Sequence, residues 1–585
     1  MINLHNLFNK TIKSILIALP LYGGVGGGLL LASCSVDDTK PQGMLDQETA
    51  FSHPENLVTA AYASMGDDWY SYPFNLWPYG DMSADDCYKG GSGLGDTGYH
   101  PMEVFSSLTN DRGEFDELWY RLYVAISRCN RAIESMKGAD GEVADQNKTL
   151  YAEARFLRAH FYYKLQQMWY EVPLVLENMD NAQIEATKQS THDEVMQFLV
   201  KEFTYAHDNL PATGPSQTGR ATRAAASAYL AKVYLNWAYG DGYESTTGYA
   251  HVDTKKMENV VKYADEVLAD GYDILPSFGD VFMVSNKNSV ESVFAVQHSN
   301  KADDGTQFGR ANWSNMLNGC WGIWSCGWDF HKPSQNLVNA FKTKNGLPMF
   351  DEYNKDHNTY PVNGATTGQR WDPRLFHTVG MPTFPYKYEE QFTLTMDNSR
   401  NPADYGFYTS MKEVPQRSKG EYYDNPWQAF GVNDYVFRTA DVMLMKAEAQ
   451  IELNELGKAL EVINKIRRRA AKSIENYIDY AAEQCEIIEY PSFPDKDYAR
   501  QALRWERRLE LAMEGHRFFD LRRWGMLSTT LNTYFAEEAD SKYEGKGYAG
   551  YLKQAHFTKE KNEYFPIASN QINYVPGLYH QNKGY

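Results

Sequence analysis

The chain has 585 residues, a net charge of −19 and an aromatic content of 14%, including 42 tyrosines. This length suffices for a large buried core, and the acidic balance, without a dominant basic patch, excludes nucleic acid as a partner. The same charge disfavours electrostatic attachment to anionic lipid, whereas abundant Tyr and Trp suit half-exposed binding surfaces as well as large helical cores.

Residues 1–33 have the features of a secretory signal peptide, with two lysines followed by an apolar run that contains no acidic residue. The run ends in Leu31-Ala32-Ser33-Cys34, which resembles the bacterial lipobox, in which the cysteine becomes the lipidated first residue after cleavage. The alternative is a transmembrane anchor with a chance cysteine, but several glycines interrupt the run and no stop-transfer cluster follows. We therefore expect lipidation of Cys34 and a short polar tether over residues 34–45.

Apolar residues then recur at helical spacing along much of the chain. We predict helices over residues 46–66, 114–137, 148–170, 192–210, 219–240 and 255–270, and two helices joined near Asn454–Gly457 within 437–472. Their lengths and their alanines at close-contact positions are typical of tetratricopeptide-like helix pairs. Residues 275–436 are loop-rich and aromatic, with short strand-like runs such as Ser292–Gln297. The predicted fold is mostly α, a scaffold of helix pairs with a large loop-rich region carrying short strands. Its N-terminal helical region, 46–274, and its C-terminal region, 275–585, are expected to pack as one globular unit.

The stretch 504–524, RWERRLELAMEGHRFFDLRRW, combines dense charge with an apolar helical stripe. Gly515 tolerates the left-handed conformation that ends a helix, so we expect a helix, a break and a short second helix. The pairs predicted to bond across the helix surface are Arg507 with Glu510 and Glu514 with Arg517. We favour a structural role, in which half-buried Arg–carboxylate pairs clamp this stretch to the core. The alternative is an arginine cluster for an anionic ligand.

Two aromatic stretches, 69–89 and 313–331, are the predicted binding loops for a neutral carbohydrate. Sugar rings present C–H patches that stack on flat aromatic faces, while Asp, Asn and Arg side chains bind hydroxyl groups. Glycines exclude a stable helix from the second stretch, and burying its four tryptophans in one loop is difficult. The candidate contacts are Trp321, Trp324 and Trp328 in the second stretch, and Trp69, Trp77, Asp85, Asp86 and Tyr88 in the first. The alternatives are that the tryptophans fill the core beneath long loops and that the aspartates cap turns.

No catalytic or metal-binding motif accompanies these candidates. Asp81, Asp85 and Asp86 contain the carboxylate pair that a glycosidase needs, but nearness in sequence does not give the separation required. No metalloprotease, serine hydrolase or cysteine nucleophile pattern is present, and a structural Ca²⁺ site in the acidic loops has no EF-hand spacing to support it. Cys320 and Cys326 are close enough to form a disulfide in an oxidising compartment, the alternative being two free thiols. We predict neither catalysis nor a cofactor.

Several segments resemble, in order, the SusD/RagB family of outer-membrane glycan-binding lipoproteins of Bacteroidetes. They are the lipobox at Cys34, Ala152–Ala159 (AEARFLRA), the helix over 219–240, Ile463–Arg467 (INKIR), 504–524, and the closing Tyr564–Ile567 and Gln581–Tyr585. The departures are small: Tyr170–Pro173 lacks the usual Gly, and Lys583 replaces the usual Pro.

The resemblance implies a non-catalytic lipoprotein held in the outer membrane by acylated Cys34. It also implies exposure at the cell exterior, since Ser35–Asp38 is similar to the acidic signal of surface lipoproteins. The implied partner is a TonB-dependent transporter of the SusC type, for which the lipoprotein captures and delivers oligosaccharide or polysaccharide as a lid. The alternatives are a RagB-like protein that captures peptides, a surface glycoside hydrolase, and a protein-binding scaffold. A scaffold has no need of exposed tryptophans.

Overall fold

The computed structural model describes residues 51–212, 218–240, 252–299, 310–325, 327–356, 368–423, 428–543 and 545–585. The chain divides into two units, Met1–His53 and Pro54–Tyr585, and only residues 51–53 of the first are described. The predicted signal peptide and tether, with Cys34, and also Cys326, therefore lie outside the described residues.

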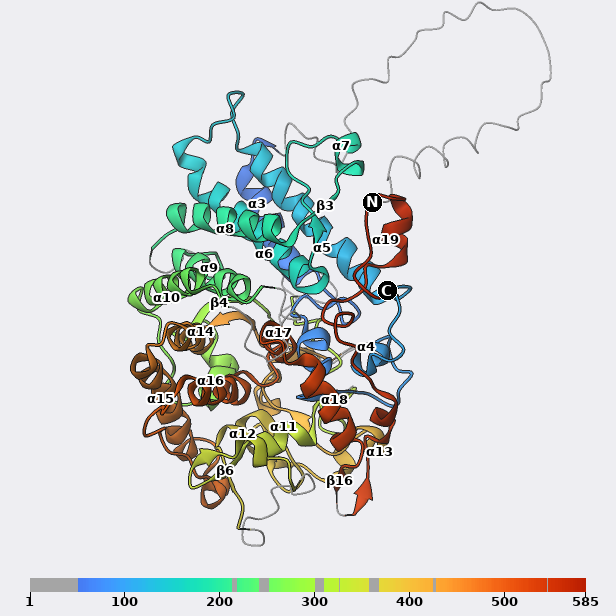
Figure 1. The fold of residues 1–585 in the computed structure, drawn as a ribbon, viewed down its shortest axis with the longest axis vertical. Coiled ribbons are helices and arrows are strands. Elements are labelled where there is room, and N and C mark those ends of the chain that lie inside the picture. The colour runs from blue at the N-terminus through green and yellow to red at the C-terminus, as the bar shows by residue number, and fades with distance from the viewer. Residues whose placement is uncertain are drawn as a thin grey trace, which may run out of the picture. The chain divides into compact units, whose positions relative to one another are not determined.

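Pairs of long helices make up much of the unit Pro54–Tyr585 (Figure 1). They are α3 (Pro54–Ala63), α5 (Gly113–Ser135), α6 (Lys148–Trp169), α8 (His192–Asn209), α9 (Arg223–Ala238), α10 (Thr254–Ala269), α14 (Thr439–Glu452), α15 (Leu456–Lys472) and α16 (Lys496–Leu511). Each packs against the next in the series as far as α15, and α14 also packs against α16. The prediction of a mostly helical scaffold of helix pairs is confirmed. The predicted regions 46–274 and 275–585 contact each other at several places, including α10 against α14 and β1 against β5.

Shorter helices and strands fill the rest of the unit. The helices are α4 (His100–Val104), α7 (Asn181–Glu185), α11 (Gln335–Ala340), α12 (Arg374–Thr378), α13 (Pro402–Tyr405), α17 (Arg517–Arg523), α18 (Leu527–Glu538) and α19 (Ser569–Tyr574). The antiparallel strand pairs that matter for the site are β1 (Cys87–Gly90) with β5 (Phe330–Pro333), and β4 (Ser292–Val296) with β15 (Asp434–Arg438). A three-stranded sheet has β6 (Lys342–Lys344) between β7 (Leu347–Pro348) and β8 (Arg370–Trp371). The remaining pairs are β2 (Val172–Pro173) with β3 (Gln189–Ser190), β9 (Val379–Gly380) with β12 (Thr409–Ser410), β10 (Pro385–Tyr386) with β11 (Glu389–Thr393), β13 (Tyr422–Tyr423) with β14 (Ala429–Phe430), and β16 (Lys542–Tyr543) with β17 (Lys546–Gly547).

Helix α6 is buried on nearly all sides because α3, α5 and α8 surround it. Its arginines therefore need internal partners: Arg155 and Arg158 both pair with Glu202 of α8, the latter at 2.7 Å. Helix α9 packs closely against α8 and α10, since half of its buried residues are alanines. Local capping fixes the start of these helices; the Thr191 side chain accepts from Glu194 N, for example, in a capping box.

The stretch 504–524 forms a helix, a turn and a short helix, as predicted. Helix α16 ends at Leu511, Met513 and Gly515 have positive φ angles of 64° and 79°, and α17 follows. The two predicted pairs within the stretch are wrong. Arg507 pairs with Asp441 and Asp520, and Glu510 pairs with Arg374, Arg438 and Arg469. Glu514 pairs with Lys412 and Arg438, and Arg517 pairs with Asp85. These side chains point into the protein, where partners from other segments are closer than those one turn away.

Candidate functional site

The two aromatic stretches predicted to bind a ligand lie against each other. The half-buried indole of Trp69 stacks on Trp313, with 5.3 Å between ring centroids and 27° between ring planes. The Trp77 indole donates from Nε1 to Ser314 O at 3.2 Å. Two loops far apart in sequence therefore form one aromatic region.

An exposed group within this region, which we call the platform, consists of Trp321, Trp328 and Arg400. The side chain of Trp321 is 43% exposed and that of Trp328 is half-buried. The Arg400 guanidinium lies 5.5 Å from the Trp321 ring and 5.0 Å from the Trp328 ring, so it links the two indoles through cation–π contacts. Asn398 Nδ2 donates to Trp321 O at 3.0 Å, and Gly322 has a φ of 76°, so the loop turns sharply beside the exposed ring.

Polar groups from the glycine-rich loop after β1 border the platform. Arg400 Nη1 lies 4.0 Å from Asp96 Oδ2, and Asn401 Nδ2 donates to Ser92 O at 3.1 Å. Lys89 Nζ donates to Asp96 O at 2.8 Å, which fixes this loop from inside. Flat aromatic faces are thus bordered by a guanidinium, a carboxylate and side-chain amides, groups that can bind the hydroxyls of a sugar. Sequence reasoning missed Arg400, Asn398 and Asp96, because no local pattern connects them with the tryptophans.

Two predicted tryptophan contacts are buried instead. Trp324 is 3% exposed and packs against Tyr422 and Phe430, with ring centroids 4.8 and 5.1 Å away. Trp77 is 2% exposed and lies 4.7 Å from the His331 ring. The prediction that Trp324 contacts a surface ligand is wrong, because the loop turns this indole into an apolar cluster. Trp77 is likewise unavailable to a ligand at the outer surface, although it lines a partly open cavity.

Asp85 and Asp86 are also buried, so the prediction that they contact a surface ligand is wrong. Asp85 pairs with Arg508 at 3.0 Å and with Arg517 at 2.7 Å, and Asp86 pairs with Arg508 at 2.8 Å. Burial would raise the pKa of Asp85, but the two guanidiniums outweigh it and lower the pKa to about 2. Burial, together with the neighbouring Asp85 carboxylate, raises the pKa of Asp86 to about 6. The arginine partners lie more than 400 positions away, so sequence proximity could not reveal these pairs.

Tyr88 and Asp81 are fully buried as well. The Tyr88 hydroxyl donates to Glu538, so its prediction as a ligand contact is also wrong. Asp81 Oδ2 accepts from Gly515 N at 2.7 Å and lies 3.1 Å from His331 Nε2. Asp81 is therefore held in the interior, as are Asp85 and Asp86, the other two carboxylates of the glycosidase alternative.

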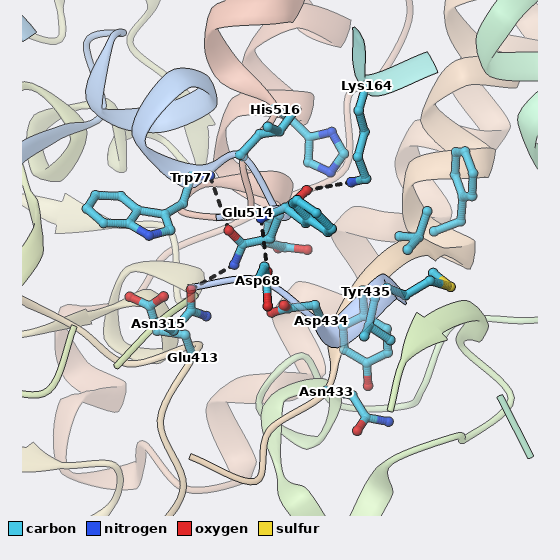
Figure 2. A pocket seen from close by; sticks show the side chains of 18 of the residues that line it. Asp68, Trp77, Lys164, Asn315, Glu413, Asn433, Asp434, Tyr435, Glu514 and His516 are labelled. Atoms are coloured by element: carbon cyan, nitrogen blue, oxygen red, sulfur yellow. Dashed lines mark hydrogen bonds between the residues drawn. The ribbon is translucent and has the colours of Figure 1, made fainter. Parts of the chain in front are cut away.

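A cavity of about 170 Å³ lies between helices α6 and α9, the loops around the aromatic region, and residues 513–519 (Figure 2). Polar residues on its wall include Asp68, Lys164, Asn315, Asn433, Asp434 and His516. They come from widely separated segments, and of them only Asn315 lies in a stretch that the sequence marked as a binding loop.

The predictions about a metal site, a disulfide and a membrane-spanning helix can be compared only with the described residues. Within the described ranges, no group of three or more His, Cys, Asp or Glu side chains is arranged to hold a metal ion. Cys320 is a buried, free thiol, which favours the alternative without a disulfide, and Cys326 lies outside the described residues. Among helices in the described part of the chain, none combines the length and the apolar character needed to cross a bilayer.

Comparison with known proteins decides the family. The sequence model of the SusD family matches residues 290–585, more than half of the chain. The chain belongs to the SusD family. A second model, described as starch-binding associating with outer membrane, matches residues 38–235. A SusD-like protein of Bacteroides ovatus is 25% identical over 508 residues, covering 85% of this chain and 80% of its own length.

Solved SusD-family structures share the fold. A SusD homolog of Bacteroides thetaiotaomicron superposes with a TM-score of 0.69 at 22% identity, covering 92% of this chain and 97% of that one. A laminarin-binding SusD-like protein gives 0.64 at 22% identity, with 91% and 99% covered. A crystal structure with a xylogluco-oligosaccharide gives 0.64 at 21% identity, with 90% and 98% covered.

Proposed function

We propose that this SusD-family protein is a non-catalytic, carbohydrate-binding lipoprotein of the outer membrane. The observation that carries the proposal is the exposed indole of Trp321, held beside Trp328 by the Arg400 guanidinium. A flat apolar face with charged and amide groups at its border matches a sugar ring, which has apolar C–H faces and hydroxyl groups at its edge. The laminarin-binding and xylogluco-oligosaccharide-bound relatives support a neutral glycan as the ligand class.

The membrane attachment and the transporter partner are parts of the same proposal. Acylation of Cys34 would anchor the protein, because each buried CH₂ of an acyl chain contributes ~0.8 kcal/mol to membrane binding. The acidic Ser35–Asp38 segment supports exposure at the cell exterior. The outer-membrane wording of the second family model supports the same location. The family resemblance supports delivery to a SusC-type TonB-dependent transporter as part of this proposal.

The absence of catalysis is also proposed. The acidic residues that could have formed a glycosidase pair are buried, and Asp85 and Asp86 both pair with Arg508. A glycosidase needs two carboxyl groups facing the same glycosidic bond, and these groups do not face the solvent. Their role is to hold the loop before β1 against α16.

Affinity electrophoresis tests the proposal directly. Mature protein should migrate more slowly in gels that contain laminarin, xyloglucan or another neutral polysaccharide, and reducing-sugar release from the same glycans should stay at background. Retardation should be lost in Trp321→Ala and kept in Tyr574→Ala, a matched change at another exposed aromatic, 48% exposed in α19. If no polysaccharide in the panel retards the protein, the peptide-capturing alternative replaces the proposal. Measurable sugar release would contradict the non-catalytic role.

A further inference from the structure

The partly open cavity beside the aromatic region has the size of one six-membered ring. Its volume is about 170 Å³, and an engineered apolar protein cavity of about 150 Å³ binds benzene. Here the wall is mixed, with rings such as Trp77 and Phe437 beside side-chain amides of Asn75, Asn315 and Asn433. A ligand that fits this wall has apolar faces and polar groups around its edge.

Asp68 provides a buried acceptor on the cavity wall. Its side chain is 6% exposed, and Oδ2 accepts from Phe74 N at 2.9 Å and from the Ser314 hydroxyl. The other oxygen, Oδ1, is buried without a hydrogen-bond partner among the described residues. Figure 2 shows Asp68 at the centre of the cavity residues. A buried, unpaired carboxylate oxygen costs free energy that a ligand hydroxyl would recover.

Lys164 provides hydrogen-bond donors on the cavity wall, and it bonds to the backbone of Phe74, as Asp68 does. It extends from α6, and its Nζ donates to Phe74 O at 2.6 Å (Figure 2). An ammonium has three donors, so this bond leaves two for other partners. Burial lowers the pKa of Lys164 to about 8, so the group remains mostly charged at neutral pH.

These two groups limit the chemistry of the occupant. An apolar ring would leave the Asp68 oxygen and the Lys164 donors unpaired. An anion would meet the Asp68 and Asp434 carboxylates, and a cation would meet Lys164 and Lys232. A neutral ring that carries several hydroxyls satisfies donors and acceptors at once.

We propose that this cavity binds one pyranose ring of the glycan, either a chain end or a single-sugar branch. The inference rests on the proposed function and adds to it a ligand subsite separate from the platform residues. Two of the segments that line the cavity also carry the Trp69–Trp313 stack, since Asp68 precedes Trp69, and Asn315 follows Trp313 by two positions. A ring in the middle of an unbranched glycan is linked on both sides and cannot enter a cavity of this size alone. The subsite would therefore select chain ends and single-sugar branches over rings within the main chain.

Saturation-transfer NMR with methyl glycosides of glucose, galactose and xylose tests the inference. At least one of these probes should bind the full-length mature protein. Lys164→Met removes the ammonium at nearly constant length and should weaken binding about tenfold or more, because a hydrogen bond to a charged group is lost. Val436→Phe, on β15, adds volume at the cavity wall and should weaken binding similarly. The control, Lys201→Met, changes an exposed lysine of α8 and should bind as the wild type does.

The outcomes separate this inference from the proposed function. If polysaccharide retards the protein in gels but no methyl glycoside binds, the proposed function stands and the cavity holds water only, which overturns the inference. Binding that is unchanged in folded Lys164→Met and Val436→Phe also overturns it, because the sugar then lies elsewhere. If neither polysaccharide nor methyl glycoside binds, both proposals fall. Circular dichroism establishes that each variant is folded before binding is measured.

Discussion

Arg438 shows how single residues hold the loop-rich region to the helices. Its side chain is 1% exposed and pairs with Glu291 at 3.1 Å, with Glu510 at 2.6 Å and with Glu514 at 2.6 Å. Removing one member of such a buried network leaves charges without partners in a region of low dielectric. The sequence indicates that the arginines of 504–524 need carboxylates. It cannot indicate which ones, because most of the carboxylate partners come from other segments of the chain.

Arg438→Met should lower the free energy of unfolding by about 3–5 kcal/mol, because it leaves buried carboxylates unpaired. The control is Arg468→Met, whose pair with Glu489 is 51% and 45% exposed. A surface pair of this kind contributes at most about 1 kcal/mol. Urea unfolding at pH 7 measures both, and similar losses in the two variants would contradict the buried clamp.

The buried His377 makes stability depend on pH. Burial lowers its pKa to about 3, from an ordinary value near 6.5, so the neutral ring is the form compatible with the fold. The stabilising contribution is complete above pH 6.5, and it is lost as the pH falls toward 3 because only the unfolded chain takes up the proton. His377→Gln should remove this dependence. The difference in unfolding free energy between the wild type and His377→Gln should shrink by ~1.4 kcal/mol for each unit by which the pH falls from 6 to 4. Denaturant titrations over that range measure the deficit, and a constant deficit would contradict the burial of a neutral ring.

Among the elements, α9 depends most clearly on small side chains. Its buried positions include Ala224, Ala225, Ala226, Ala228 and Ala231, which lets α8, α10 and α14 approach closely. The apolar periodicity and the alanines were visible in the sequence, so this helix and its neighbours were predicted nearly to their ends.

Ala226→Leu should destabilise the protein by ~1–3 kcal/mol, because a fully packed interface has no room for three more carbons. Ala60→Leu is the control, since Ala60 is exposed on α3 and the same change there should stay within about 0.5 kcal/mol. Thermal and urea unfolding compare the two. A neutral effect of Ala226→Leu would show that the α9 interface is loosely packed.

The aromatic loops were harder to predict than the helices. Trp321 and Trp324 are three residues apart in one loop, yet the first is 43% exposed and the second 3%. An irregular loop has no fixed period, so sequence spacing does not tell which side chain faces inward. The exposure of each ring depends on a residue distant in sequence: Arg400 lies over Trp321, and Phe430 packs against Trp324.

At the scale of the whole molecule, we propose that the carbohydrate-binding protein is attached to the membrane by acylated Cys34. Cys34→Ser should abolish incorporation of labelled palmitate and release the protein from the membrane fraction, because the variant lacks the cysteine that is expected to carry the acyl chains. Cys485→Ser, at a half-buried cysteine, should keep the label. Fractionation of cells that express the full chain measures both, and labelled Cys34→Ser protein would contradict the anchor.

The most direct test of the account is calorimetric titration of a glycan that retards the protein in gels. Trp321→Ala should weaken binding by ~1–3 kcal/mol, by analogy with the stacking of bases on aromatic side chains, while its unfolding free energy stays within about 0.5 kcal/mol of the wild type. An unchanged dissociation constant in folded Trp321→Ala would contradict the claim that this exposed indole binds carbohydrate.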